Sequence, residues 1–167
     1  SDLGLILLGN VVENISGLKL DEYIEKYLLA PLGMESTFYN PLIEFKSRIV
    51  PTEVVSGYRN GLLHGEVHDE NAHKLGGVAG HAGLFSSARD LGVFAQTVLQ
   101  GGIYGNKRIF EKSILQNFTT KALIDTSSSR CLGWDSPSGE ASGGIYISDN
   151  SYGHTGYTGT SLWIDPD

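Results

Sequence analysis

The residues best suited to chemistry form a glycine-rich string near the carboxyl end, Gly153-His154-Thr155-Gly156-Tyr157-Thr158-Gly159. The imidazole can donate a hydrogen bond or share a proton, since its ordinary pKa is near 6.5. The hydroxyl of Thr155 can bind a substrate carboxylate or carbonyl. The main-chain N–H of Tyr157 can face a developing oxyanion, where a fixed donor is worth about 3 kcal/mol. Taken alone, however, this string favours a simpler interpretation, a hairpin that carries a solvated histidine.

Imidazoles and carboxylates also gather between residues 64 and 81, a combination that can bind zinc. The residues are His64, His68, Asp69, Glu70, His73 and His81. Their spacing matches no His-Glu-x-x-His signature, so the sequence favours a polar loop whose side chains bind backbone groups, and we expect no metal site. Glycines 76–83 lack a phosphate-loop pattern. We expect that loop to pack against another backbone and to position His81.

Two candidate nucleophiles are weak. Ser16-Gly17-Leu18-Lys19 matches the Ser-x-x-Lys pattern, but that mechanism needs both side chains on one continuous helix, and Gly17 is placed to end a helix. Cys131 could pair with His154 as a thiol–imidazole couple. It lies beside Leu132 and Trp134 in an apolar segment, which favours a buried, inert thiol.

Composition excludes several classes of protein. The chain has 167 residues, of which 40% are hydrophobic and 19% charged, so it can bury a core. A net charge of −7 argues against binding to nucleic acid. The longest apolar run, Leu5–Leu8, is far shorter than a membrane span. A single cysteine excludes an intrachain disulfide, and 22 glycines suggest a site built largely from main chain.

The elements that would position the candidate residues are predicted to be helices in the first two thirds of the chain. Apolar spacing predicts a first helix over residues 3–15, buried on nearly all sides, capped by Ser1 or Asp2 and followed by Gly17. A second helix is expected over residues 21–30, ended by Pro31. After an irregular stretch (40–85), Ser87 and Asp90 resemble a capping box before a third helix that ends at glycines 101–102. A fourth helix is expected over residues 111–123.

Short strands are predicted afterwards, over residues 131–135, 145–148, 152–155 and 160–164. Glycine and serine separate them, which indicates antiparallel hairpins. Helices followed by an antiparallel sheet predict an α+β fold.

Three stretches, in order, resemble known sequences. They are Ser1-Asp2-Leu3-Gly4 running on to Pro31-Leu32-Gly33-Met34, then Gly80-His81-Ala82-Gly83-Leu84-Phe85-Ser86, and finally Gly153-His154-Thr155-Gly156 with Trp163-Ile164-Asp165-Pro166. Together they resemble the serine β-lactamase-like hydrolases, most closely the branch of class C β-lactamases, penicillin-binding proteins and esterases. The resemblance runs from Ser1 to Asp167.

The resemblance implies a β-lactamase/transpeptidase-like fold and a partial domain over residues 1–167. His154-Thr155-Gly156 matches the family's third motif, and Asp2 stands where its second motif usually has asparagine. The tyrosine of that motif and the nucleophilic Ser-x-x-Lys are expected upstream, and a last strand and helix downstream. Without the nucleophile we expect this chain alone to be inactive. Without the last strand and helix, strand 160–164 would have an unpaired apolar edge, so we also expect the chain alone to be unstable or oligomeric.

The implied parent is a serine hydrolase that transfers or hydrolyses the acyl group of an amide, β-lactam or ester. His154 and Tyr157 are the candidate catalytic residues. Asp2, Thr155, Gly156 and His81 are the candidate substrate-binding residues. No cofactor is expected. The expected partner is a small-molecule or peptide substrate, and an exported location would suit the family.

Two alternatives stay open at this point. A β-lactamase-like binding protein would keep the cleft without the chemistry. A metalloenzyme would use the histidines between residues 64 and 81.

Overall fold

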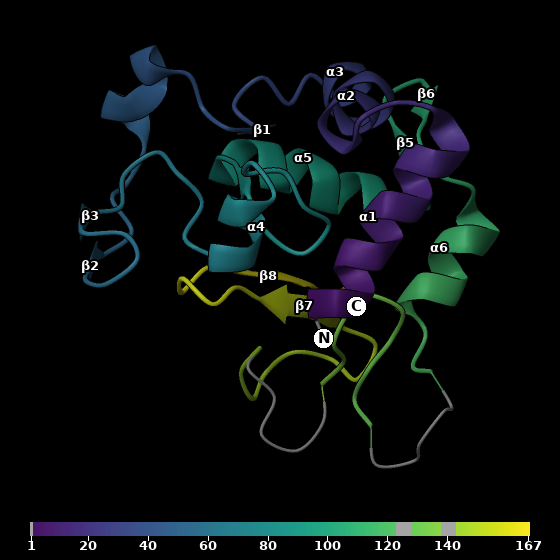
Figure 1. The fold of residues 1–167 in the computed structure, drawn as a ribbon. Helices are drawn as coiled ribbons and strands as arrows, with labels where there is room; N and C mark the ends of the chain where they lie inside the picture. Colours follow the sequence, from purple (N-terminus) through teal and green to yellow (C-terminus); the bar gives the residue numbers. More distant parts are fainter. Residues whose placement is uncertain (1, 123–127, 138–142) are drawn as a thin grey trace. The chain divides into compact units, whose positions relative to one another are not determined.

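A computed structural model describes residues 2–122, 128–137 and 143–167 (Figure 1). The chain divides into two compact units, residues 1–90 and 91–167, and each is described by itself. Ser1, one of the two expected helix caps, lies outside the described residues.

The first unit begins with helix α1 (Asp2–Ser16), in close agreement with the predicted helix. Asp2 is its first helical residue rather than its cap. Gly17 follows with a φ of +70°, a left-handed conformation that glycine adopts without steric cost and that ends the helix.

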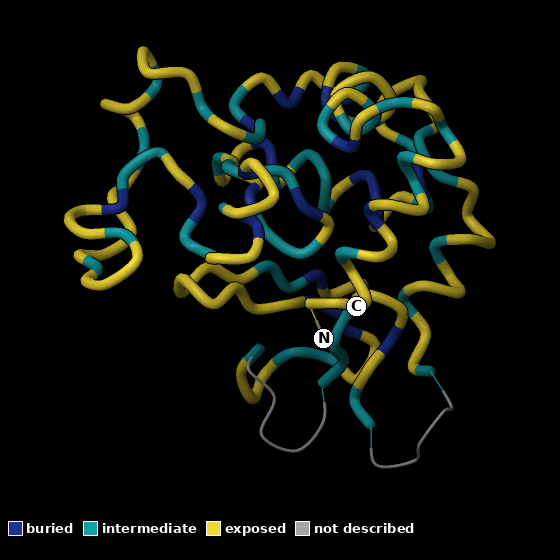
Figure 2. Tube along the Cα trace, viewed as in Figure 1, coloured by how far each residue is buried: buried dark blue, intermediate teal, exposed yellow. Residues whose placement is uncertain are grey.

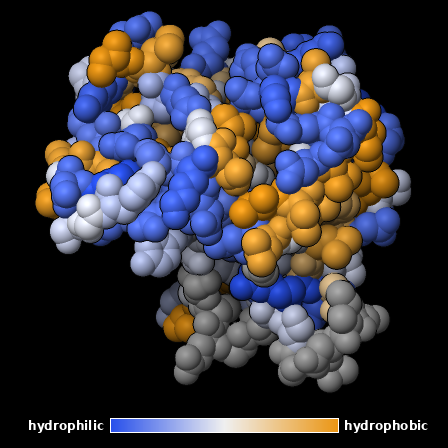
Figure 3. All heavy atoms as spheres, viewed as in Figure 1, coloured by the Kyte–Doolittle hydropathy of each residue, from blue (hydrophilic) through white to orange (hydrophobic). Residues whose placement is uncertain are grey.

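The expectation that α1 is buried on nearly all sides is wrong. Gly9 is its one buried residue, whereas Leu3 is 70% exposed and Ile15 is 82% exposed. Most of α1 is exposed in Figure 2, and Figure 3 shows an apolar patch on the surface where α1 lies. The helix contacts its own unit at the small residue Gly9, where the backbone of Gly80 approaches, and at Glu13, whose carboxylate accepts the N–H of Leu20 at 3.0 Å.

The second helical stretch is longer and less regular than predicted. It comprises α2 (Leu20–Ile24), a π-helical turn η1 (Glu25–Leu29) and α3 (Ala30–Leu32). The expectation that Pro31 ends this helix is wrong. The proline stands in the first turn of α3, directly after the π-helical turn. Gly33, with a φ of +66°, ends the stretch instead.

The remainder of the first unit is a set of short elements, as the weak periodicity of residues 40–85 indicated. Strand β1 (Phe38–Tyr39) pairs antiparallel with β4 (Leu84–Phe85), and β2 (Val54–Val55) pairs with β3 (Gly61–Leu62). A 3-10 helix, η2 (Ile43–Arg48), and a short helix, α4 (Glu70–Lys74), complete it. Apolar residues around α4 form a small core of Val67, Ala72 and Ala79, against which Ala82 packs.

Helix α5 (Ala88–Leu99) starts at the end of the first unit and continues into the second. Of the two hydrogen bonds expected in the capping box of Ser87 and Asp90, one forms. The N–H of Asp90 donates to Ser87 Oγ at 3.2 Å, but the carboxylate of Asp90 accepts from Ser36 N–H and the Thr37 hydroxyl, each at 2.8 Å. Asp90 thus anchors the start of α5 to the segment before β1.

The second unit continues with a hairpin of β5 (Ile103–Tyr104) and β6 (Lys107–Arg108), then α6 (Lys112–Thr119), which is shorter than predicted. Strands β7 (Tyr152–Thr155) and β8 (Ser161–Ile164) then pair antiparallel, close to their predicted positions (Figure 1). The apolar residues of this hairpin pack with those of α5 and α6. This core contains Phe94, Val98, Leu115, Trp134, Tyr152, Leu162 and Ile164.

Two of the predicted strands do not form. Residues 131–135 contribute only isolated bridges, Arg130 with Asp135 and Asp135 with Gly153, and residues 145–148 form no strand. Both segments have suitable residue types, but a strand also needs a partner that supplies a ladder of hydrogen bonds. The observed mixture of helices and small antiparallel sheets confirms the α+β class.

None of the described helices is by itself long and apolar enough to cross a membrane. α1 and the stretch Leu20–Leu32 reach that length and composition only as a pair bent by 73°.

Candidate functional site

Asp69 organises the candidate residues of the first unit. It is the N-cap of α4, and its Oδ1 accepts the N–H of Ala72 at 2.7 Å. Aspartate is among the preferred N-cap residues because its side chain satisfies an N–H that has no partner within the helix. The cap fixes the direction of this carboxylate at the start of α4.

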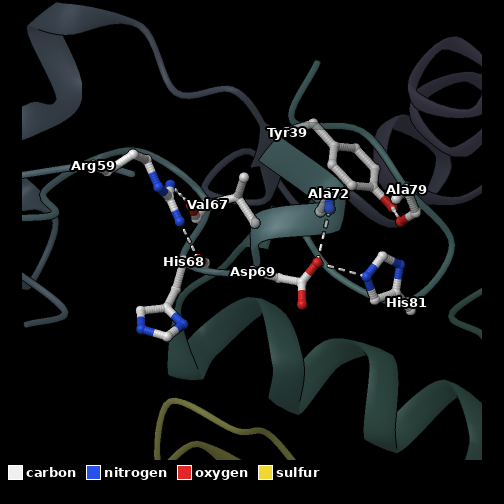
Figure 4. A network of polar contacts seen from close by, with 8 residues as sticks. All are labelled: Tyr39, Arg59, Val67, His68, Asp69, Ala72, Ala79 and His81. Carbon is white, nitrogen blue, oxygen red and sulfur yellow. Dashed lines mark hydrogen bonds and ion pairs between the residues drawn. The ribbon is translucent and has the colours of Figure 1, made fainter. Parts of the chain in front are cut away.

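His81 is joined to that carboxylate (Figure 4). Its Nε2 lies 2.8 Å from Asp69 Oδ1, and its side chain is only 3% exposed. An ionised carboxylate accepts hydrogen bonds, so Nε2 carries the hydrogen and donates it. Burial acts to raise the pKa of Asp69, but the hydrogen bonds from Ala72 and His81 outweigh it and lower that pKa. Asp69 is therefore held in the ionised form.

The glycine loop brings His81 to the start of α1. A Cβ placed on Gly80 would lie 2.2 Å from the carbonyl oxygen of Leu5, and one on Gly9 would lie 3.3 Å from the nitrogen of Gly80. This close approach of two backbones confirms the predicted role of the loop. As a result, a carboxylate oxygen of Asp2, one of Asp69 and a ring nitrogen of His81 all lie within 4.8 Å of one another.

Tyr39 holds the beginning of the same loop. Its hydroxyl donates to the carbonyl of Ala79 at 3.2 Å (Figure 4). Burial raises the pKa of Tyr39 to about 12, and the Asp21 carboxylate acts in the same direction. The phenol therefore keeps its proton and its donor role over the working pH range of most proteins.

Two other histidines of the segment make structural contacts. His64 Nε2 lies 2.8 Å from the carbonyl of Ile49, and His68 Nε2 lies 2.5 Å from Glu53. Arg59 binds the carbonyls of Val67 and His68 (Figure 4). In residues 2–122, 128–137 and 143–167, Asp2, Asp69 and His81 are the one group of three with metal-ligating atoms this close, and its Asp69 and His81 already bind each other.

In the second unit, the β7–β8 hairpin presents the glycine-rich string. His154 stands opposite Leu162 and Thr155 opposite Ser161, and Gly156 N–H closes the turn onto the Thr160 carbonyl at 2.7 Å. Glycine is required at position 153, because a Cβ there would lie 2.4 Å from the ring of Trp163. Trp163 therefore covers β7 at the residue before His154.

Both ring nitrogens of His154 have partners. Nδ1 lies 2.6 Å from the carbonyl oxygen of Thr155, and Nε2 lies 3.1 Å from Nη1 of Arg130. Arg130 in turn lies 3.7 Å from the carboxylate of Asp135. Sequence reasoning missed Arg130 because it is 24 residues from His154 and belongs to no motif.

The structure also places the remaining candidate residues of the sequence analysis. Tyr157 lies in the turn between β7 and β8 and is 94% exposed. Cys131 is buried, its Sγ lies 3.4 Å from the Thr119 carbonyl, and burial raises its pKa, so the prediction of a buried thiol is confirmed. Ser16 ends α1 whereas Lys19 caps α2, so the two do not share a helix.

Comparison with known proteins identifies the class. The sequence model of the β-lactamase family matches residues 1–167, so this chain belongs to that family. It is 41% identical to a "Putative D-alanyl-D-alanine carboxypeptidase" of Escherichia coli K12 and 39% identical to the protein of that name in Salmonella typhi. Each match covers 99% of this chain but 42% of the relative, so the chain spans less than half the length of these relatives.

Solved structures give the same fold. A β-lactamase from Mycobacterium bovis matches with a TM-score of 0.66 and 20% identity, over 99% of this chain and 51% of its own. An octameric penicillin-binding protein homologue from Pyrococcus abyssi matches with a TM-score of 0.63 and 20% identity, over 99% of this chain and 35% of its own. The predicted resemblance and the fold class are both confirmed.

Proposed function

We propose that this chain is part of a serine hydrolase that works through an acyl-enzyme, with the nucleophilic serine in a segment outside the chain. The observation that carries the proposal is the third family motif, His154-Thr155-Gly156, at the end of β7, where a hairpin turn follows it directly. Membership of the β-lactamase family supports the same class of chemistry.

In the proposed reaction, the serine oxygen adds to the carbonyl carbon of the substrate while a base takes its proton. The tetrahedral intermediate then collapses, the leaving amine departs with a proton, and water hydrolyses the resulting ester. The main-chain N–H of Tyr157 is proposed to stabilise the oxyanion. Thr155 and Gly156 are proposed to bind the substrate next to the scissile bond.

Asp2 and His81 are proposed to line the substrate-binding side formed by α1. Their side-chain tips lie within 4.8 Å of one another, which supports a shared role. The names of the Escherichia coli and Salmonella relatives favour a peptide ending in D-alanyl-D-alanine over a simple ester.

The test is acylation of the full-length parent with a fluorescent penicillin and with a fluorophosphonate, read by mass spectrometry. We expect a stoichiometric adduct on a serine that precedes lysine by three residues. Thr155→Val should slow penicillin acylation, and the same change at Thr158, to which no role is assigned, serves as the control. Saturable binding without any adduct would instead support a non-catalytic binding protein.

A further inference from the structure

Asp69 and His81 form an acid–base pair that takes no part in the reaction described above. The side chain of His81 is 3% exposed, and its Nε2 donates to the carboxylate of Asp69 at 2.8 Å. The Nδ1 atom of His81 is also buried, and it has no hydrogen-bond partner among the described residues. A buried polar atom without a partner is rare in folded proteins, and a catalytic role is one of the few reasons for which it is kept.

Two further hydrogen-bonding side chains hold this pair in place. The guanidinium of Arg59, whose side chain is 13% exposed, donates to the two carbonyls directly before Asp69 (Figure 4). The hydroxyl of Tyr39 donates to the carbonyl two residues before His81. Each segment that carries a member of the pair is thus anchored beside it. Side chains that are fixed in advance are what catalysis requires, because a reacting group must already be oriented when the substrate binds.

Asp2 brings a third polar group to the pair. A carboxylate oxygen of Asp2, one of Asp69 and a ring nitrogen of His81 lie within 4.8 Å of one another. The centre of an equilateral triangle of that size lies about 2.8 Å from each corner, which is an ordinary hydrogen-bond distance for water. Asp2 is exposed, so its corner of the triangle is open to solvent. A single water molecule can therefore contact all three groups at once.

The two carboxylates differ in their ability to take a proton from that water. Oδ1 of Asp69 already accepts the N–H of Ala72 at 2.7 Å and the N–H of His81 at 2.8 Å. Hydrogen bonds to a carboxylate stabilise its charged form and make it a weaker base. Asp2 lies on the solvent side, and it is the carboxylate that is placed to accept a proton, whereas Asp69 is placed to orient the water.

We propose that Asp2 is the general base of the deacylation step and that Asp69 and His81 are positioning residues for its water. This inference rests on the proposed function, in which a serine ester of the substrate acyl group is hydrolysed. Asp2 takes a proton from the water while the water oxygen forms a bond to the ester carbonyl carbon. The bond from that carbon to the serine oxygen then breaks, the serine oxygen receives the proton from Asp2, and the carboxylic acid product leaves.

The test separates acylation from deacylation in the full-length parent. A fluorescent penicillin labels the serine, excess reagent is removed, and mass spectrometry follows the adduct with time. Asp2→Asn should form the adduct at close to the unsubstituted rate and lose it about 10²- to 10⁴-fold more slowly, the range by which a positioned base accelerates a step. Slower acylation with an unchanged loss of the adduct would overturn the proposal, because Asp2 would then only bind substrate.

Hydroxylamine supplies a second readout, which a merely structural role of Asp2 would not move. This nucleophile attacks an ester without a base to activate it. It should therefore speed the loss of the adduct far more in Asp2→Asn than in the unsubstituted protein. Equal acceleration in both proteins would overturn the proposal, as would an unsubstituted parent that forms the adduct but never hydrolyses it.

The positioning pair is tested at His81 with a matched histidine control. His81→Gln keeps a side-chain N–H for Asp69 and should retain part of the deacylation rate, whereas His81→Leu should lose about 10-fold, the effect of one hydrogen bond. The control is His73→Gln, since His73 also has a buried Nδ1 without a partner in the described residues but does not belong to the triangle. Equal deacylation rates in His81→Leu and His73→Gln would remove the pair from the mechanism.

Failure of the unsubstituted parent to form any serine adduct is a different result. It would count against the proposed hydrolase, whereas the outcomes above concern only the step that follows acylation.

Discussion

Gly80→Ala is the substitution for which the structure makes the sharpest prediction. The new Cβ would lie 2.2 Å from the carbonyl oxygen of Leu5 and 3.0 Å from its carbonyl carbon. To regain ordinary contact, the loop must move about 1 Å away from α1, and neither backbone is a flexible side chain that can turn aside. Overpacking of this kind costs about 1–3 kcal/mol, so we expect the free energy of unfolding to fall by that amount.

Gly4→Ala is the matched control. Gly4 lies on α1 as well, but a Cβ there meets nothing within 4 Å. Alanine should stabilise the exposed helix by up to about 1 kcal/mol, so the two substitutions should have opposite signs. Urea denaturation of the full-length parent, followed by circular dichroism, measures both midpoints. An unchanged midpoint for Gly80→Ala, or equal losses for both variants, would refute the packing of this loop against α1.

Three further predictions concern charge, thiol reactivity and association. Asp69→Ala should destabilise the protein by about 1 kcal/mol or more through loss of the cap, and Asp69→Asn should lose less because it keeps an acceptor. The folded state lowers the pKa of Asp69 below 3.8, so the ionised carboxylate stabilises the protein at pH values above 3.8. Urea midpoints measured from pH 7 down to pH 3 should therefore show a shrinking difference in stability between Asp69→Ala and the parent. Cys131 should react with a disulfide reagent much more slowly than a free thiol until denaturant is added, and fast labelling of the native protein would contradict its burial. The 167-residue chain expressed alone should associate through the edge of β8, which has no further strand beside it in the described residues, whereas a monodisperse monomer with one sharp unfolding transition would contradict this.

The elements that the sequence predicted correctly are those marked by a short-range pattern of apolar residues and glycines. Strands β7 and β8, helix α5 and the end of α1 at Gly17 follow from residue spacing and from where glycine interrupts it. Residues 145–148 had equally good strand composition, yet they form none, because composition does not say which segment will supply the opposite ladder.

Burial and long-range contacts were harder to predict. The apolar spacing of α1 shows that it has a face to bury but not what covers it, and most of its leucines are exposed here. The contact of His81 with Asp69 had one local signal, an aspartate placed to cap a short helix, which sequence reasoning overlooked. The contact of Arg130 with His154 had no local signal, since it depends on the pairing of Asp135 with Gly153.

The π-helical turn at Glu25–Leu29 makes the number of residues in this stretch matter more than their identity. In this turn the N–H of Ala30 donates to the carbonyl of Glu25, five residues earlier, whereas an α-helix joins residues four apart. Pro31 follows directly. Removing a single residue from the turn would restore the narrower spacing and shift Pro31 and Gly33 by about 100° around the helix axis relative to α2. Single-residue deletions here should therefore harm the protein more than any conservative replacement in the same five positions.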